Sequence, residues 1–139
     1  MSVIQRTRDT YVGLYDFAAS GGAIGAFDLG VQIPPNVIIH EFGVRVVTAP
    51  LSAGAATISF DLINNTVNPA VTTVGGLIAA TGKAQWIINT IVMGQSPTGA
   101  GPLAPIFVAN SFSVGMSIAA ATLTVGKLIF FLRATSFDF

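Results

Sequence analysis

Apolar and polar side chains alternate in short runs along most of this chain, and Gly, Pro, Asn and Ser separate the runs. The clearest run spans 56–63, where Ile58, Phe60 and Leu62 alternate with Thr, Ser and Asp. Alternation with a period of two, together with many β-branched residues, is typical of strands that bury one face. The same pattern predicts strands at 11–17, 26–31, 37–48, 85–92, 111–118 and 122–133. About seven or eight short strands predict an all-β fold, an antiparallel β-sandwich of the jelly-roll type.

The run at 37–48 follows Pro34-Pro35-Asn36 and is predicted to be a long strand. Its expected inner face consists of Ile38, Phe42, Val44 and Val46. Glu41 and Arg45 share the other face, but four residues along a strand separate them by about 13 Å, so each needs a different partner or water. His40 is the single histidine of the chain, and we expect it to be a packed imidazole with a backbone or carboxylate partner.

The run at 122–133 is apolar on both faces, because Leu128, Phe130 and Leu132 alternate with Ile129 and Phe131. A strand of this kind either lies between two layers of its own domain or turns one face toward another molecule. The second alternative makes Ile129 and Phe131 candidates for an oligomer interface. A bulge at Gly126 that shifts the alternation is the other explanation.

Residues 1–10 are the polar, charge-rich part of the chain and show no apolar period. They are predicted to be an N-terminal arm in front of a single β-sandwich domain at 11–139. Arg6 and Arg8 are the candidate contacts of this arm with a neighbouring subunit; a frayed terminus without a task is the alternative. The segment 94–105, with three prolines, is long for a hairpin and is either a contact loop or a plain connection.

Composition makes the surface of this domain unusual, since 52% of the 139 residues are hydrophobic and only 9% are charged. A monomer of this size exposes most of its outer faces, and six acids with six bases cover little of them. Gly and Pro interrupt the uncharged stretch 84–126, so that no apolar run approaches the roughly 20 residues of a membrane-spanning helix. We therefore expect a self-associating protein and not a membrane protein.

Charge and chemistry exclude several classes of function. A formal net charge of zero provides no basic face for a phosphate backbone, which argues against nucleic-acid binding. The chain has no cysteine and one histidine, and its acidic residues are scattered singly. These residues predict no catalytic site, no metal site and no cofactor, so we expect a protein that is not an enzyme.

Several segments resemble a family of small β-sandwich structural proteins of tailed bacteriophage virions, of the head-decoration, cement or head-fibre type. The matching segments are 16–25 (DFAASGGAIG), 28–34 (DLGVQIP), 38–41 (IIHE), 52–60 (SAGAATISF) and 123–128 (LTVGKL). These are strand and turn patterns and carry no catalytic residues; the middle of the chain, 65–82, departs from the pattern. The resemblance implies a β-sandwich that decorates or cements a head shell, or that forms part of a surface appendage.

The expected function is that of a capsid decoration or cement protein, which self-associates as a trimer and binds the major capsid protein or other virion proteins. Two alternatives remain open: a head-fibre or spike module that binds host glycans, and a self-assembling shell subunit. A glycan site would need an aromatic platform, for which only Trp86, Tyr11 and Tyr15 combine a ring with a polar group. The start of the chain lacks a secretory pattern, so we expect synthesis in the host cytoplasm and a final location in the virion.

Overall fold

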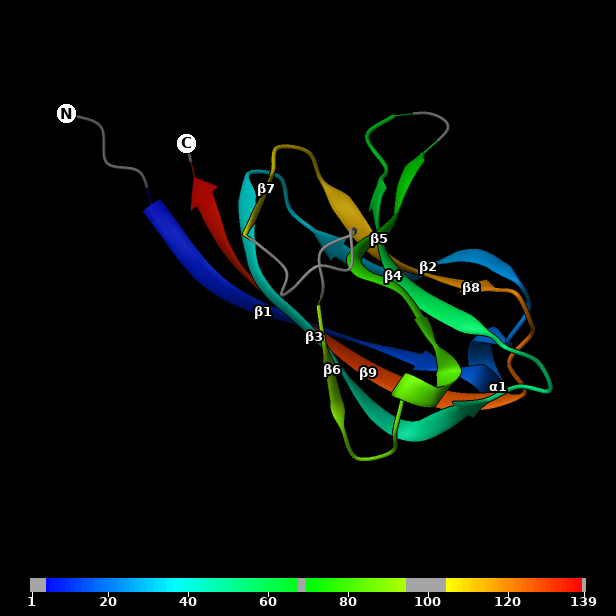
Figure 1. The fold of residues 1–139 in the computed structure, drawn as a ribbon. Helices are drawn as coiled ribbons and strands as arrows, with labels where there is room; N and C mark the ends of the chain where they lie inside the picture. Colours follow the sequence, from blue (N-terminus) through cyan, green and yellow to red (C-terminus); the bar gives the residue numbers. More distant parts are fainter. Residues whose placement is uncertain (1–4, 68–69, 95–104, 139) are drawn as a thin grey trace.

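A computed structural model describes residues 5–67, 70–94 and 105–138 and shows two antiparallel sheets that face each other (Figure 1). The strands of the described residues are β1 (Gln5–Asp16), β2 (Gly25–Ile33), β3 (Val37–Leu51), β4 (Thr57–Asn64), β5 (Val71–Gly82), β6 (Ile91–Met93), β7 (Ile106–Val108), β8 (Phe112–Ala119) and β9 (Val125–Asp138). A short helix, α1 (Phe17–Ser20), follows β1, and a 3₁₀ turn, η1 (Lys83–Gln85), follows β5. In these ranges no helix is long and apolar enough to cross a membrane.

The order of the strands is that of a jelly roll. One sheet has the order β1-β9-β3-β6, with β7 also paired to β3, and the other has the order β2-β8-β4-β5. The first strand therefore pairs with the last, and successive strands alternate between the two sheets over much of the chain. The predicted all-β, jelly-roll-like sandwich is confirmed.

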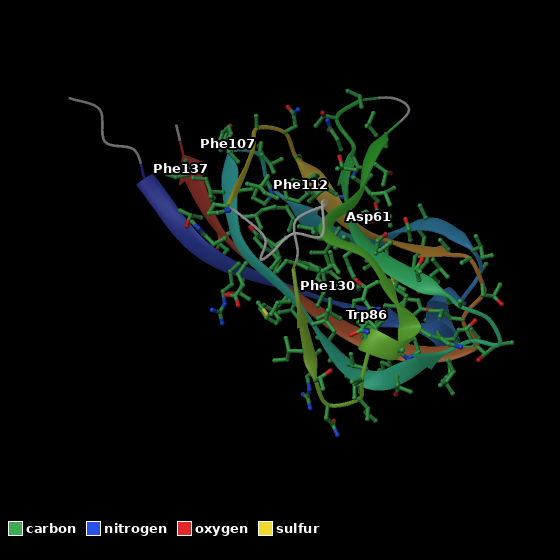
Figure 2. The ribbon with its side chains drawn as sticks, in the orientation of Figure 1. Asp61, Trp86, Phe107, Phe112, Phe130 and Phe137 are labelled. Carbon is green, nitrogen blue, oxygen red and sulfur yellow. The ribbon has the colours of Figure 1, made fainter. Side chains whose placement is uncertain are left out.

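The space between the sheets is filled by apolar side chains from both of them. Phe60 lies at the centre of an aromatic cluster, with ring centroids 5.4 Å from Phe42, 6.1 Å from Phe130 and 5.9 Å from Trp86. Figure 2 shows Trp86 and Phe130 among the side chains between the two sheets. Trp86 is buried, and its indole N–H donates to the carbonyl of Thr81 at 3.3 Å. The period-two pattern thus identified the inward faces of β4 and β9. On the other face of β4, which the pattern predicted to be in water, Ser59 and Asp61 are buried as well.

The inner face of β3 differs from the prediction at its start. Ile39 pairs with Ala134 and Glu41 pairs with Arg133, so that His40 is an extra residue in β3 relative to β9. This β-bulge reverses the alternation on its N-terminal side, and Ile39 is buried in place of Ile38. His40 is consequently exposed, and the prediction of a packed imidazole is wrong.

Two further expectations about strands need correction. The predicted strand at 85–92 is instead the 3₁₀ turn and an irregular segment, and only Ile91–Met93 is extended. A long strand that the sequence analysis left out, β5, occupies 71–82. Its pattern was obscured because its register against β4 shifts twice, which breaks the alternation.

The N-terminal segment expected to be an arm enters the sheet. β1 begins at Gln5 and pairs residue by residue with β9, from Gln5 opposite Asp138 to Asp16 opposite Lys127. Residues 5–10 are thus continuous with the predicted first strand, and residues 1–4 lie outside the described part of the chain. Most of the predicted loop 94–105 also lies outside it. Whether residues 1–10 contact a neighbouring subunit stays a prediction.

Candidate assembly interface

The outer face of the β1-β9-β3-β6 sheet has two rows of residues that cross these four strands, and both rows are largely apolar except for Arg45 on β3. Leu128, Phe130 and Leu132 are buried against the other sheet, so Ile129 and Phe131 between them project outward. The strand register builds the rows as follows: Val12 opposite Phe131, Phe131 opposite Gly43 and Gly43 opposite Met93; then Leu14 opposite Ile129, Ile129 opposite Arg45 and Arg45 opposite Ile91. We call these residues, without the charged Arg45, the outer apolar face.

Both interface candidates from the sequence lie at the centre of the outer apolar face. Ile129 and Phe131 are half-buried by their neighbours on the same sheet, while Val12, Leu14, Ile91 and Met93 are exposed. The alternative in which this strand is sandwiched inside its own domain does not describe the fold, since the second sheet covers only the opposite face of β9. Whether Ile129 and Phe131 contact another molecule stays a prediction.

Gly43 allows the ring of Phe131 to lie close to β3. A Cβ atom at residue 43 would come within 2.4 Å of Phe131 Cζ and within 3.2 Å of Met93 Sδ. The missing side chain therefore leaves the space that the Phe131 ring occupies beside Met93. The result is a low apolar surface formed from three adjacent strands.

Ion pairs border the outer apolar face at both ends of the strands. At one end Arg133 on β9 donates to Glu41 on β3 at 3.1 Å, and at the other end Lys127 on β9 lies 3.9 Å from Asp16 on β1. Arg133 also extends over the ring of Phe131, with its guanidinium carbon 5.8 Å from the ring centroid. Glu41 thus has the cross-strand partner that the sequence required, and it is not Arg45.

A polar hollow adjoins the Arg133 end of the outer apolar face. Its volume is about 470 Å³, and it is lined by Asp9, Thr10, His40, Glu41, Arg133, Ala134 and Thr135. The bulge in β3 brings His40 into this hollow, where His40 Nε2 lies 2.8 Å from Thr135 Oγ1. The sequence pattern missed this cluster, because a strand without a bulge would turn His40 and Glu41 to opposite faces.

The remaining residues singled out in the sequence lie apart from one another. Arg6 and Arg8 belong to β1 and stand opposite Phe137 and Thr135 in the backbone register. Tyr15 is buried, and its hydroxyl donates to the carbonyl of Gly21 at 2.6 Å. Over the described ranges, no three His, Asp or Glu side chains gather closely enough to hold a metal ion.

Two tyrosines of β1 have shifted acidities. Burial, and to a smaller extent the charge of Asp16, raise the pKa of Tyr15 above its ordinary value of 10.0. Burial and the charge of Asp9 likewise raise the pKa of Tyr11. Both hydroxyls therefore stay protonated at neutral pH, and Tyr15 acts there as a hydrogen-bond donor.

Three solved structures of bacteriophage capsids contain a chain that is similar in fold to this one. The chain matches a chain in the capsid of Helicobacter pylori bacteriophage KHP30 with a TM-score of 0.59 and 12% identity, covering 98% of this chain and 97% of that one. For the capsid of Ralstonia phage GP4 the values are 0.59 and 16%, covering 96% and 84%. For the capsid of cyanophage Pam1 they are 0.62 and 13%, covering 94% and 86%. At these identities the likeness shows a shared fold.

Sequence comparison adds no relative to these structures. No protein-family description matches the chain. No curated protein matches it either. The structural matches are nonetheless nearly complete in both directions, so each matched capsid chain is about the size of this one.

Proposed function

We propose that this protein is a structural component of a bacteriophage virion, specifically a decoration or cement protein of the head. In this proposal it self-associates as a trimer and binds the major capsid protein, thereby stabilising the shell. The observation that carries the proposal is the outer apolar face. It lies on the outside of one sheet of the sandwich, and ion pairs border it at both ends of the strands. An exposed apolar area with a charged border is typical of a surface that meets another protein.

The structural matches support the proposal in two ways. The three matches described above share this fold over 94% or more of the chain and come from bacteriophage capsids. The chain also covers at least 84% of each matched chain, as expected for a small accessory component. A subunit that tiles a closed shell by itself usually needs more than one domain, so these sizes favour decoration over the alternative of a shell subunit.

The alternative of a glycan-binding fibre or spike module has less support. Of the three aromatic residues that it required, Trp86 and Tyr15 are buried in the core. The polar hollow near His40 has no aromatic ring in its lining, although sugar sites usually offer one beside their polar groups. Of the three candidate rings only Tyr11, which is half-buried, therefore reaches the described surface.

Two measurements test the proposal. The first compares phage heads that lack this protein with complete heads during heating; we expect the deficient heads to release DNA at a lower temperature and the added purified protein to restore resistance. Identical release curves would contradict cementing. The second measures the solution mass by light scattering over a hundredfold range of concentration. A concentration-independent trimer supports the proposal, and a strict monomer contradicts self-association without the shell.

A further inference from the structure

The two sheets differ in how their edges are built. An unpaired edge is a row of free N–H and C=O groups, and proteins usually interrupt such edges with bulges or keep them short. β2 is irregular between Asp28 and Gln32, and β5 shifts its register twice. At the far edge of the other sheet, β6 and β7 have three residues each.

β1 is the exception among the described edges. It pairs with β9 through twelve consecutive residues without a shift in register, and it contains no proline. No described strand pairs with its other side, and Figure 1 shows it at the margin of the sheet. Two of its exposed side chains, Val12 and Leu14, are also the outermost residues of the two apolar rows. A long, regular and apolar edge is the form that accepts another strand.

The sequence of β1 is complementary to itself when two copies run antiparallel. The strand has Arg8 toward its start and Asp16 at its end, with Val12 midway between them. Pairing about Val12 sets Arg8 of one copy opposite Asp16 of the other, Thr10 opposite Leu14, and Val12 opposite Val12. Residues opposite each other then share a face, because the pairing joins even-numbered positions to even-numbered ones.

We infer that β1 is a docking edge for β1 of a second copy, with the two strands antiparallel about Val12. The contact joins two five-stranded sheets into one continuous sheet and extends the outer apolar face across a two-fold axis. The inference rests on the proposed self-association and specifies one of its contacts. A trimer held by the outer apolar face would use this edge to meet the next trimer across a local two-fold axis of a shell.

Disulfide cross-linking tests the register, because the chain has no cysteine of its own. Directly opposed residues have Cβ atoms close enough for a disulfide, whereas two copies of residue 14 would lie about 13 Å apart in this pairing. We expect Val12→Cys to give a covalent dimer at least about tenfold faster than Leu14→Cys under mild oxidation. Val74→Cys on the irregular edge strand β5 is the matched control, since Val74 is 59% exposed and Val12 61%.

Amide hydrogen exchange distinguishes edge pairing from packing of the faces. Alternate N–H groups of β1 point away from β9, and strand pairing slows their exchange, whereas contact through the outer apolar face alone does not. We expect slowing of at least about tenfold between dilute and concentrated protein. Cross-linking at Val12 no faster than at Leu14, or outward amides with unchanged exchange, overturns the inference. If mass measurements show association at the same time, the proposed self-association stands without this edge.

Discussion

The carboxylate of Asp61 on β4 accepts a hydrogen bond from the backbone N–H of Gly75 on β5 at 2.9 Å. Asp61 is fully buried, and it also accepts hydrogen bonds from the hydroxyls of Ser59 and Ser117. Gly75 has a φ of 71°, a conformation that favours glycine, and lies where β5 slips its register against β4. Asp61 therefore holds the irregular part of an edge strand against the sheet.

A second aspartate repeats this arrangement on the opposite edge of the same sheet. Asp28 on β2 accepts from the N–H of Gly30 at 2.7 Å and from the hydroxyl of Ser113 at 2.8 Å. Both aspartates stand opposite Gly115 of β8, one on each side. The difference is burial, since Asp28 is exposed.

Asp61→Ala is expected to destabilise the fold far more than Asp28→Ala. Removing the Asp61 carboxylate leaves three donors without their acceptor in a buried place, at about 1–3 kcal/mol for each unsatisfied group, whereas water reaches the donors around Asp28. We expect a loss of at least about 3 kcal/mol in the free energy of unfolding for Asp61→Ala and about 1 kcal/mol for Asp28→Ala. Urea denaturation followed by tryptophan fluorescence measures both. Equal losses of unfolding free energy in the two variants would contradict the conclusion that burial makes the Asp61 hydrogen bonds more important than those of Asp28.

Gly43→Ala is expected to destabilise the fold by about 1–3 kcal/mol, because the new methyl group collides with the Phe131 ring. Gly82→Ala is the control, since a Cβ there meets no atom within 4 Å. Replacing Phe131 by Leu in the Gly43→Ala background should recover part of the loss. Chemical denaturation of the wild type, Gly43→Ala, Phe131→Leu, the double variant and the Gly82→Ala control checks this, and additive effects of Gly43→Ala and Phe131→Leu would contradict the contact.

Ile91→Lys is expected to weaken self-association and to leave the fold intact. Ile91 is 57% exposed on the outer apolar face, so a charge there is solvated in the monomer and buried on contact. Ile24→Lys is the control, because Ile24 is equally exposed but precedes β2 on the other sheet. Sedimentation equilibrium should show a weaker association constant for Ile91→Lys alone. The same constant for both variants would remove the outer apolar face as the interface.

Stability is expected to fall above about pH 10 through the tyrosines of β1. The pKa of Tyr15 is raised by burial in the folded state, so the unfolded chain releases that proton at a lower pH than the folded one. The stabilisation is complete below the ordinary pKa and is lost as pH rises through the raised one. Tyr15→Phe should flatten the decline in urea midpoint between neutral pH and about pH 11. If the urea midpoint of Tyr15→Phe declined as steeply as that of the wild type, the loss of stability would come from titratable groups other than Tyr15.

The strand pattern shows how far this sequence could be interpreted alone. Period-two alternation located most strands and identified Ile129 and Phe131 as outward-facing. These predictions needed only the rule that successive side chains of a strand point to opposite faces. It failed where a bulge adds a residue, as at His40, and along β5, whose register shifts twice. A bulge depends on the pairing of two distant strands, and no local pattern records that pairing.

The sequence by itself determined the class of this protein: an apolar, β-rich domain with few charges and with a last strand that is apolar on both faces. The hydrophobic period and the composition are properties of the sequence alone, so they can be interpreted without knowledge of the fold. Only the tertiary structure decided which strands adjoin, and hence that Val12, Phe131, Gly43 and Met93 form one row. Residues so far apart in the chain meet through long-range pairing of backbone groups, which the order of side chains along the chain does not specify.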